Sequence, residues 1–292
     1  MIPLGPELPW RLDRPAVFPG VPAWGALTAS SPPDPVALIP QPSVTPEWTW
    51  GGSDGSGVRV CVLDSGVDAS HTRVGPLARS VAVGTGPDGQ PEIADCAPED
   101  RAGHGTACAG IIRSVAPGVE LCSVRVLTDG KFGSGAALLA GLGWAIDQGY
   151  DIINLSLATT RMEFCSALHE LADRAYFRRS ILVTSASNMP VRSYPWTFSS
   201  VLSVASHNEG DPLTYYYNPS PPVDFYAMGV GVPVAVPGAG EMRLTGNSFA
   251  APHLAGIIAR ILAKHPYLTP FQLKTLLYLN ARNVAELNRS PG

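Results

Sequence analysis

The chain has 292 residues, of which 45% are hydrophobic and only 15% charged, with a formal net charge of −4 at pH 7. This composition excludes a disordered chain and favours a folded α/β body, and the length allows one large core or two ordinary ones. A pI near 5.8 gives no basic surface for nucleic acid, and no apolar run is long enough to predict a membrane span.

The cysteines are odd in number and scattered, and none belongs to a C-x-x-C pair: Cys61, Cys96, Cys108, Cys122 and Cys165. This pattern fits neither a disulfide scaffold nor a zinc site, although one internal disulfide remains open. The N-terminus lacks the charged start and apolar stretch of a secretory signal. We therefore expect a cytoplasmic protein without a bound metal or cofactor.

Residues 1–50 differ in composition from the rest of the chain. They contain twelve of the 29 prolines and four of the six tryptophans, namely Trp10, Trp24, Trp48 and Trp50. Proline favours extended, irregular backbone, whereas each tryptophan must bury a large apolar area. We therefore expect an N-terminal arm over residues 1–50 that packs on a body formed by residues 51–285. A loose tail is the alternative.

From Gly57 onward, apolar runs typical of strands alternate with helical patterns. GVRVCVLDSG predicts a buried strand that ends at an acidic turn, and GHGTACAGIIRSV predicts a helix opening at a histidine between glycines. Further strands are predicted in VELCSVRVL, DIINLSL, ILVTSASN and SVLSVAS. Further helices are predicted in SGAALLAGLGWAIDQG, ALHELADRAYFRR, SFAAPHLAGIIARILAKHP and LTPFQLKTLLYLNA. This alternation predicts an α/β fold of three αβα layers around a mostly parallel central sheet.

Three predicted element ends carry side chains suited to acyl transfer. Asp64 follows the first strand, His104 opens a helix, and Ser248 lies at the start of another. Each has an ordinary structural interpretation when taken alone: a turn aspartate, a core histidine and a helix cap. Together, at the end of a predicted strand and at the starts of two predicted helices, they favour a catalytic site. Ser248 would be the nucleophile, His104 the base and Asp64 the carboxylate that orients the base.

The chain resembles the subtilisin-like serine peptidases over roughly residues 50–280. The matching motifs are VCVLDSGVD, GHGTACAG and GNSFAAPHLAG, in that order. The resemblance implies a subtilisin-like fold in which Asp64 orients His104 and His104 takes the proton of Ser248. It also implies that Asn188, at the end of ILVTSASN, completes an oxyanion hole with the backbone N–H of Ser248.

The resemblance further implies that a peptide or protein substrate binds in extended form between two segments. These segments are Gly133-Ser134-Gly135 and Ser156-Leu157-Ala158. Ala186 and Ser187 would line the pocket for the side chain that precedes the cleaved bond, with Ser193 as a candidate for its floor. A glycine turn and a core strand end are the ordinary interpretations of the two segments. The oligomeric state is left open.

Several positions depart from the family pattern and add bulk near the expected cleft. Asn247 and Phe249 flank the serine where the family usually has Thr and Met, Ser187 replaces a glycine, and Ala158-Thr159 replace two glycines. These changes favour a selective processing peptidase over a digestive one. The short segment after the histidine helix also leaves no room for the calcium-binding loop of many relatives.

A second hypothesis from another class is a catalytically silent module that kept the fold and the peptide groove. The presence of all four expected catalytic groups argues against it. The glycine-rich stretches GSGAALLAGLG and GVGVPVAVPGAG do not have the G-x-G-x-x-G spacing of a nucleotide loop. The sequence therefore predicts a serine endopeptidase that acts through an acyl-enzyme.

Overall fold

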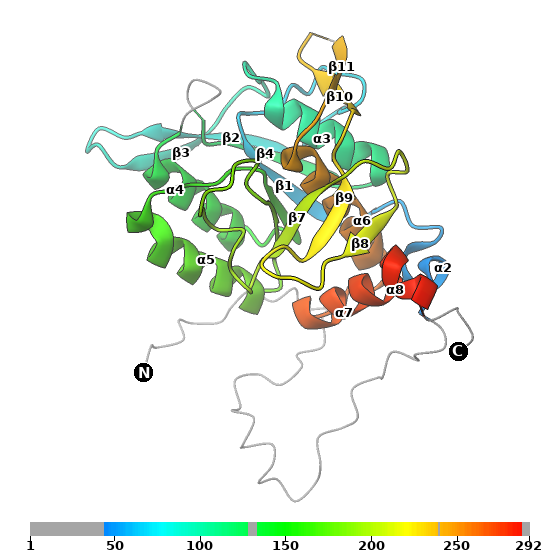
Figure 1. Ribbon diagram of the computed structural model, residues 1–292. Helices are drawn as coiled ribbons and strands as arrows, with labels where there is room; N and C mark the ends of the chain where they lie inside the picture. Colours follow the sequence, from blue (N-terminus) through cyan, green and yellow to red (C-terminus); the bar gives the residue numbers. More distant parts are fainter. Residues whose placement is uncertain (1–43, 128–132, 239, 288–292) are drawn as a thin grey trace, which may run out of the picture.

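The computed structural model describes residues 44–127, 133–238 and 240–287. A large sheet has the strand order β3-β2-β4-β1-β5-β6-β7-β9-β8 (Figure 1). The strands between the two edges, from β2 to β9 in this order, pair in parallel. The edge strands β3 and β8 pair antiparallel with β2 and β9. The prediction of an α/β fold with a mostly parallel sheet is confirmed.

The strands of this sheet are β1 (Arg59–Asp64), β2 (Arg79–Thr85), β3 (Pro91–Asp95), β4 (Glu120–Arg125), β5 (Ile152–Leu155), β6 (Ile181–Ser185), β7 (Leu202–His207), β8 (Tyr215–Tyr217) and β9 (Phe225–Met228). A separate hairpin pairs β10 (Val232–Val236) with β11 (Gly240–Leu244). The α-helices are α2 (Pro46–Trp50), α3 (His104–Val115), α4 (Gly135–Asp147), α5 (Cys165–Phe177), α6 (Asn247–Lys264), α7 (Pro270–Asn280) and α8 (Arg282–Leu287), and η2 (Met162–Phe164) is a 3₁₀ turn.

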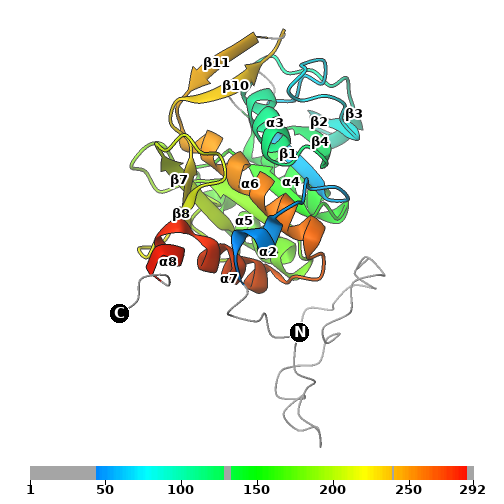
Figure 2. The ribbon, with the colours of Figure 1, turned by 90° about the vertical axis from the view of Figure 1, so that its right-hand side faces the viewer.

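Two apolar layers hold helices against opposite faces of the sheet. In β1, Val60 and Val62 join the core that contains α3 and α6, whereas Cys61 and Leu63 join the core that contains α4 and α5. This division follows from the two-residue period of a strand, because successive side chains point to opposite faces. Figures 1 and 2 show the resulting three layers.

The strands and helices predicted from apolar patterns are present at the expected places. The hairpin β2–β3 and the short strands β8 to β11 were not predicted. The hairpin β10–β11 packs on α3, where Val232 and Val234 share a small core with Ile111 (Figure 1). All five cysteines are free thiols, so the internal disulfide left open by the sequence is not formed. No helix among the described residues could span a membrane.

The last residues of the predicted arm form a helix instead of extended backbone. In α2, Thr45 caps the first turn and Pro46 occupies the first helical position, which suits its fixed φ. Trp50 is buried in the core, and the Trp48 ring lies 4.5 Å from the ring of His265 at the end of α6. Trp10 and Trp24 lie outside the described residues, so the packing of the rest of the arm stays a prediction.

Candidate active site

Asp64 is held at the carboxyl end of β1, below the surface of the molecule. Its strand is central in the sheet, between β4 and β5, and the side chain of Asp64 is 0% exposed. The carboxylate accepts the backbone N–H of Ser65 at 2.7 Å, and both of its oxygens lie 2.9 Å from Nδ1 of His104. A buried carboxylate with charged or N–H partners is stabilised in its ionised form.

His104 opens α3, and glycines on both sides let the helix approach β1. Gly103 has φ of 84°, in the left-handed region. A Cβ at Gly105 would lie 2.0 Å from the Gly66 carbonyl oxygen and 3.1 Å from Cβ of Asp64, so only glycine fits there. Because the carboxylate accepts the proton on Nδ1, the ring's Nε2 is left as the acceptor.

The environment of His104 changes its pKa in two opposing ways. Burial lowers the pKa, but the negative charge of Asp64, the hydrogen bond between the two groups and the more distant charge of Asp100 raise it. The outcome is a pKa above the ordinary histidine value of 6.5. Asp64 therefore makes His104 a stronger base than a free imidazole.

Asp100 organises the loop before α3, and the sequence reasoning did not identify it. Its Oδ1 accepts the Ser65 hydroxyl at 2.9 Å and the N–H groups of Ala102 and Gly103 at 3.0 and 2.9 Å. Its Oδ2 accepts the N–H and hydroxyl of Thr106 at 2.9 and 2.6 Å. Five donors thus tie the start of the histidine helix to the residue that follows Asp64. The signal in the sequence that could have pointed to this role was an acidic residue four positions before His104.

Ser248 lies in the first turn of α6, close to the other two groups. Its carbonyl oxygen accepts the Ser156 hydroxyl at 3.1 Å and the thiol of Cys108 at 3.6 Å. The same thiol lies within 4.8 Å of ligand atoms of Asp64 and His104. Burial raises the pKa of the Cys108 thiol well above its usual range, so this side chain stays neutral between the groups.

The side chain of Ser248 has no fixed partner. Within the described residues, Ser248 Oγ forms no hydrogen bond, and the bond to His104 that the motif predicts is therefore not made in this structure. The next residue, Phe249, is buried, and its ring centroid lies 5.7 Å from that of His104. The start of α6 thus borders the imidazole, and Ser248 is a half-buried residue.

Asn188 lies after β6 and is connected to the start of α6 by one hydrogen bond. Its Oδ1 accepts the backbone N–H of Asn247 at 2.9 Å. Because a backbone N–H can only donate, the amide oxygen must face Asn247 and the Nδ2 group must point elsewhere. Nδ2 is therefore available as a donor, close to Gly246, where a Cβ would lie 3.6 Å from it.

Asn247 has a different role from the one that its size suggested. Its Oδ1 accepts the N–H and hydroxyl of Ser206, each at 2.9 Å, and its Nδ2 donates to the carbonyls of Ala186 and Ser187 at 3.3 and 3.2 Å. The side chain thus joins the ends of β6 and β7 to the residue before Ser248. Asn247, which stands where the family usually has Thr, therefore fixes the start of α6 through hydrogen bonds.

The proposed substrate segments lie after β4 and β5, the two parallel strands on either side of β1. The hydroxyl of Ser134 caps α4 by accepting the N–H of Ala137 at 3.0 Å, so its side chain has the structural role of a helix cap. Beyond Leu157 and Ala158, Thr159 pairs with Tyr194 through N–H to carbonyl bonds of 2.9 and 3.0 Å. Both segments border the same sheet edge as Asp64.

Two serines assigned to the pocket have local bonds. Ser187 Oγ accepts the N–H of Met189 at 3.1 Å, as in a turn. Ser193 is buried, and its hydroxyl accepts Nε1–H of Trp196 at 2.8 Å.

The two glycines of the first proposed segment have no room for a side chain. A Cβ at Gly133 would lie 2.7 Å from the Val126 carbonyl oxygen, and a Cβ at Gly135 would lie 2.1 Å from the ring of Phe164.

Comparison with known proteins identifies relatives of this chain. A model of the subtilase family matches residues 55–292. Subtilisin DY of Bacillus licheniformis is 29% identical over 250 residues, which cover 80% of this chain and 87% of the relative. A thermostable alkaline protease of Halalkalibacterium halodurans is 32% identical over 234 residues, covering 76% of this chain and 62% of the relative.

Solved structures agree with these sequence matches. A cold adapted subtilisin-like serine proteinase superposes with a TM-score of 0.65 at 29% identity, over 77% of this chain and 82% of that one. Sphericase has a TM-score of 0.66 at 23% identity, over 80% and 87% of the two chains, which is a likeness of fold. The resemblance inferred from three motifs is confirmed, and the chain belongs to the subtilase family, the family of the subtilisin-like serine endopeptidases.

Proposed function

We propose that this chain is an active endopeptidase in which Asp64, His104 and Ser248 act together in acyl transfer. The observation that carries the proposal is the pair of 2.9 Å contacts from the Asp64 carboxylate to Nδ1 of His104, with Ser248 on the helix that borders the ring. This arrangement fixes one tautomer of the imidazole and leaves Nε2 to accept a proton.

The reaction starts when His104 Nε2 takes the proton of Ser248 Oγ as this oxygen attacks the peptide carbonyl. Asp64 stabilises the imidazolium that forms. The oxyanion accepts hydrogen bonds from Nδ2 of Asn188 and from the N–H of Ser248, which has no carbonyl partner in the first turn of α6. The imidazolium then gives its proton to the leaving amine, and water cleaves the acyl-enzyme by the same route.

The missing bond between Ser248 and His104 is compatible with this mechanism. A half-buried serine side chain can change its χ1 rotamer, and catalytic hydrogen bonds often shorten only when substrate is bound. The backbone position of Ser248 is fixed independently of that rotamer by the bonds that its carbonyl accepts from Ser156 and Cys108.

A selective processing role forms the second part of the proposal. Ala158 and Ser187 carry side chains where the family pattern has glycine, and the hydrogen bonds of Asn247 hold Ser187 close to the start of α6. These features support a peptide site that accepts a limited set of sequences. Relatives named as proteases support a peptide or protein substrate.

A fluorophosphonate probe distinguishes an active enzyme from a silent module. We expect the full chain to be labelled at Ser248 and the Ser248→Ala variant to remain unlabelled, with unchanged melting temperature. Digestion of a peptide library, followed by mass spectrometry, should then show few cleavage motifs. A folded chain that never reacts would support the silent peptide-binding alternative, and cleavage at many unrelated sequences would contradict selective processing.

A further inference from the structure

A hollow of about 310 Å³ lies beside the catalytic aspartate and has no assigned role. Ser65, the residue after Asp64, is part of its lining, together with strand β2 and the loop before α3. The polar and charged members of the lining are Ser65, Glu99, Arg101 and Arg125. The hollow therefore adjoins the proposed reaction site and is surrounded by more than one charged side chain.

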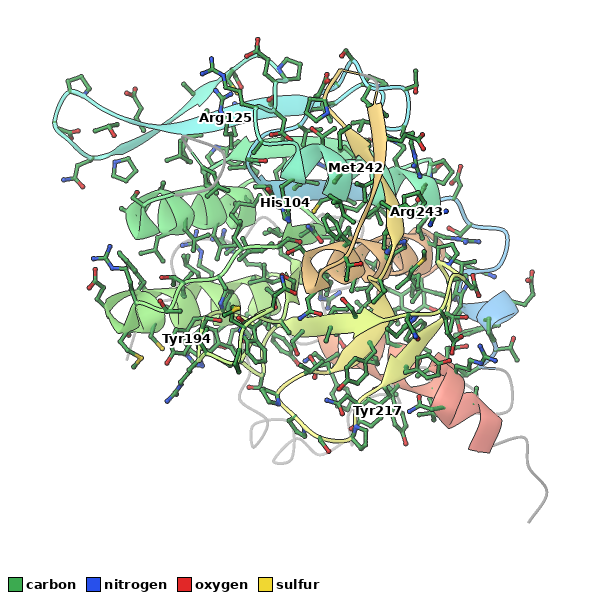
Figure 3. The ribbon with its side chains drawn as sticks, turned by 45° about the horizontal axis from the view of Figure 1, so that its top comes forward. His104, Arg125, Tyr194, Tyr217, Met242 and Arg243 are labelled. Atoms are coloured by element: carbon green, nitrogen blue, oxygen red, sulfur yellow. The ribbon has the colours of Figure 1, made fainter. Side chains whose placement is uncertain are left out.

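Arg125 is held in place by the sheet. It is the last residue of β4 and pairs in register with Asp64 of β1. Its Cδ atom would lie 3.4 Å from a Cβ placed at Gly66, which shows that the aliphatic stem runs along the turn after Asp64. Figure 3 labels Arg125 and His104, and the Asp64 that pairs in register with Arg125 is the residue that contacts His104.

The two arginines of the hollow have no acidic partner in the part of the chain that the structure describes. Neither Arg101 nor Arg125 donates a side-chain hydrogen bond or joins an ion pair there. Other arginines do, as in the pair of Arg79 with Asp95. Unpaired guanidinium groups at the edge of a concave site are suited to binding a planar anion such as a carboxylate.

Two acidic residues, Glu99 and Asp100, precede Arg101 in the loop before α3. Asp100 is buried, and its two oxygens already accept the five hydrogen bonds described above. Glu99 is exposed and contributes a single negative charge against two positive ones. Among the side chains that line the hollow itself, two are therefore cationic and one is anionic.

We propose that this hollow binds the carboxylate of an aspartate or glutamate side chain of the substrate, close to the bond that is cleaved. The inference rests on the proposed peptidase function, since it assigns a sequence preference to that reaction. A residue near the scissile bond brings its side chain close to Ser65 because Ser65 directly follows the aspartate that holds His104. Arg101 and Arg125 then select an acidic side chain at this position.

The test is the cleavage of paired peptides by the full chain. Starting from a sequence found in the library digest, each position near the cleaved bond is varied among Asp, Asn, Glu and Gln. We expect kcat/KM to be about tenfold higher for the acid than for its amide at one position, which corresponds to about 1.4 kcal/mol. The advantage should decrease with added salt, because exposed charges are screened.

Variants assign the preference to the hollow. Arg101→Gln combined with Arg125→Gln should abolish the advantage, so that the double variant cleaves the acidic peptide and its amide with about equal kcat/KM. Glu99→Gln should increase the advantage of the acidic peptide, because Glu99 is the exposed acidic residue among those that line the hollow. Arg243→Gln is the matched control, since Arg243 is exposed on the hairpin β10–β11 (Figure 3) and should have no effect.

The failure of this inference and that of the proposed function have different signatures. An enzyme that reacts with the fluorophosphonate probe and cleaves peptides without an acidic preference overturns the inference alone. A preference that survives in the double arginine variant does the same. A chain that neither reacts nor cleaves overturns both. Binding to the Ser248→Ala variant provides a readout without catalysis, in which the acidic peptide should have a Kd about tenfold lower than its amide.

Discussion

The two halves of the candidate site are held in different ways. The half formed by Asp64, His104 and Asp100 has almost all of its hydrogen bonds made through side chains, inside the protein. The half formed by Ser248 and Asn188 is held through the carbonyl of Ser248 and the Oδ1 of Asn188, and neither bond uses the Ser248 hydroxyl or the Asn188 Nδ2 group. The comparison shows that the buried aspartates and the imidazole are fixed in place, whereas the two groups to which the proposed mechanism assigns contact with the substrate do not use their reactive atoms in these bonds.

Removing the Ser248 hydroxyl should have the largest effect on catalysis and little effect on folding. We expect Ser248→Ala to lower kcat by about 10⁶-fold, the magnitude known for loss of the nucleophile in subtilisin itself. Its melting temperature should stay within about 2 °C, because Ser248 Oγ forms no hydrogen bond with any residue that the structure describes. Kinetics and calorimetry on one preparation check both values. A retained kcat would show that another residue is the nucleophile.

Asp64→Asn breaks the fixed half and should lower kcat by about 10⁴-fold, as in related triads. It should also move the pH dependence. Asp64 raises the pKa of His104, and the base acts in its neutral form, so wild-type activity should rise through a midpoint above pH 6.5. In the variant, the midpoint of the residual activity should shift to lower pH. An unchanged midpoint would remove His104 from the role of base.

The same pKa shift predicts how stability depends on pH. A raised pKa in the folded state means that the protonated His104 stabilises the fold at pH below 6.5, and that this contribution is lost as pH rises through the folded value. The stability gap between wild type and Asp64→Asn should therefore narrow with rising pH. His253 is distinguishable, since burial lowers its pKa to about 4. Urea titrations at several pH values measure the gap.

Asn188→Ala should lower kcat by about 10²–10³-fold with a small change in KM, because the proposed mechanism assigns its Nδ2 donor to the oxyanion. Asn188→Asp separates the two functions of this side chain. It keeps an oxygen that accepts the N–H of Asn247 and loses the Nδ2 donor. A similar loss in both variants is expected. Near-normal activity in Asn188→Asp would mean that Asn188 only supports the start of α6.

Asp100→Asn should affect stability more than chemistry. An amide can accept some of the five bonds of Asp100, but its NH₂ group would face donors, and we expect a loss of about 2–4 kcal/mol in the free energy of unfolding. The kcat should fall less than tenfold. Ser65→Ala, which removes one of the five donors, is the milder control. A large loss of kcat at unchanged stability would place Asp100 in the chemistry.

The central sheet could be predicted because its strands are continuous apolar runs followed by helices of regular period. The run RVCVLD of β1 is an example, since it is covered on both faces. The hairpin β2–β3 was missed although GPDGQ is a turn signal, because its strands are half-exposed and alternate irregularly. The strands of β10–β11 take their apolar partners from α3, which lies more than a hundred residues earlier.

The site could be predicted only where motifs mark it. Asp64 ends an apolar strand, Asn188 follows another, and His104 and Ser248 lie at the starts of two helices. Their catalytic roles stay predictions. Asp100 was missed because most of its partners are backbone N–H groups, which any sequence contains and only the fold brings together.

The hydrogen bonds between α2 and the C-terminal end of α6 offer a position for a probe of unfolding. Lys264 donates to the carbonyls of Glu47 and Gly51 at 2.7 and 3.1 Å, at the opposite end of α6 from Ser248. Sixteen residues of helix separate Lys264 from Ser248, or about 24 Å at 1.5 Å per residue. A fluorophore attached to the exposed side chain of Glu47, which leaves the Thr45 cap in place, would therefore report unfolding at the end of α6 farthest from Ser248.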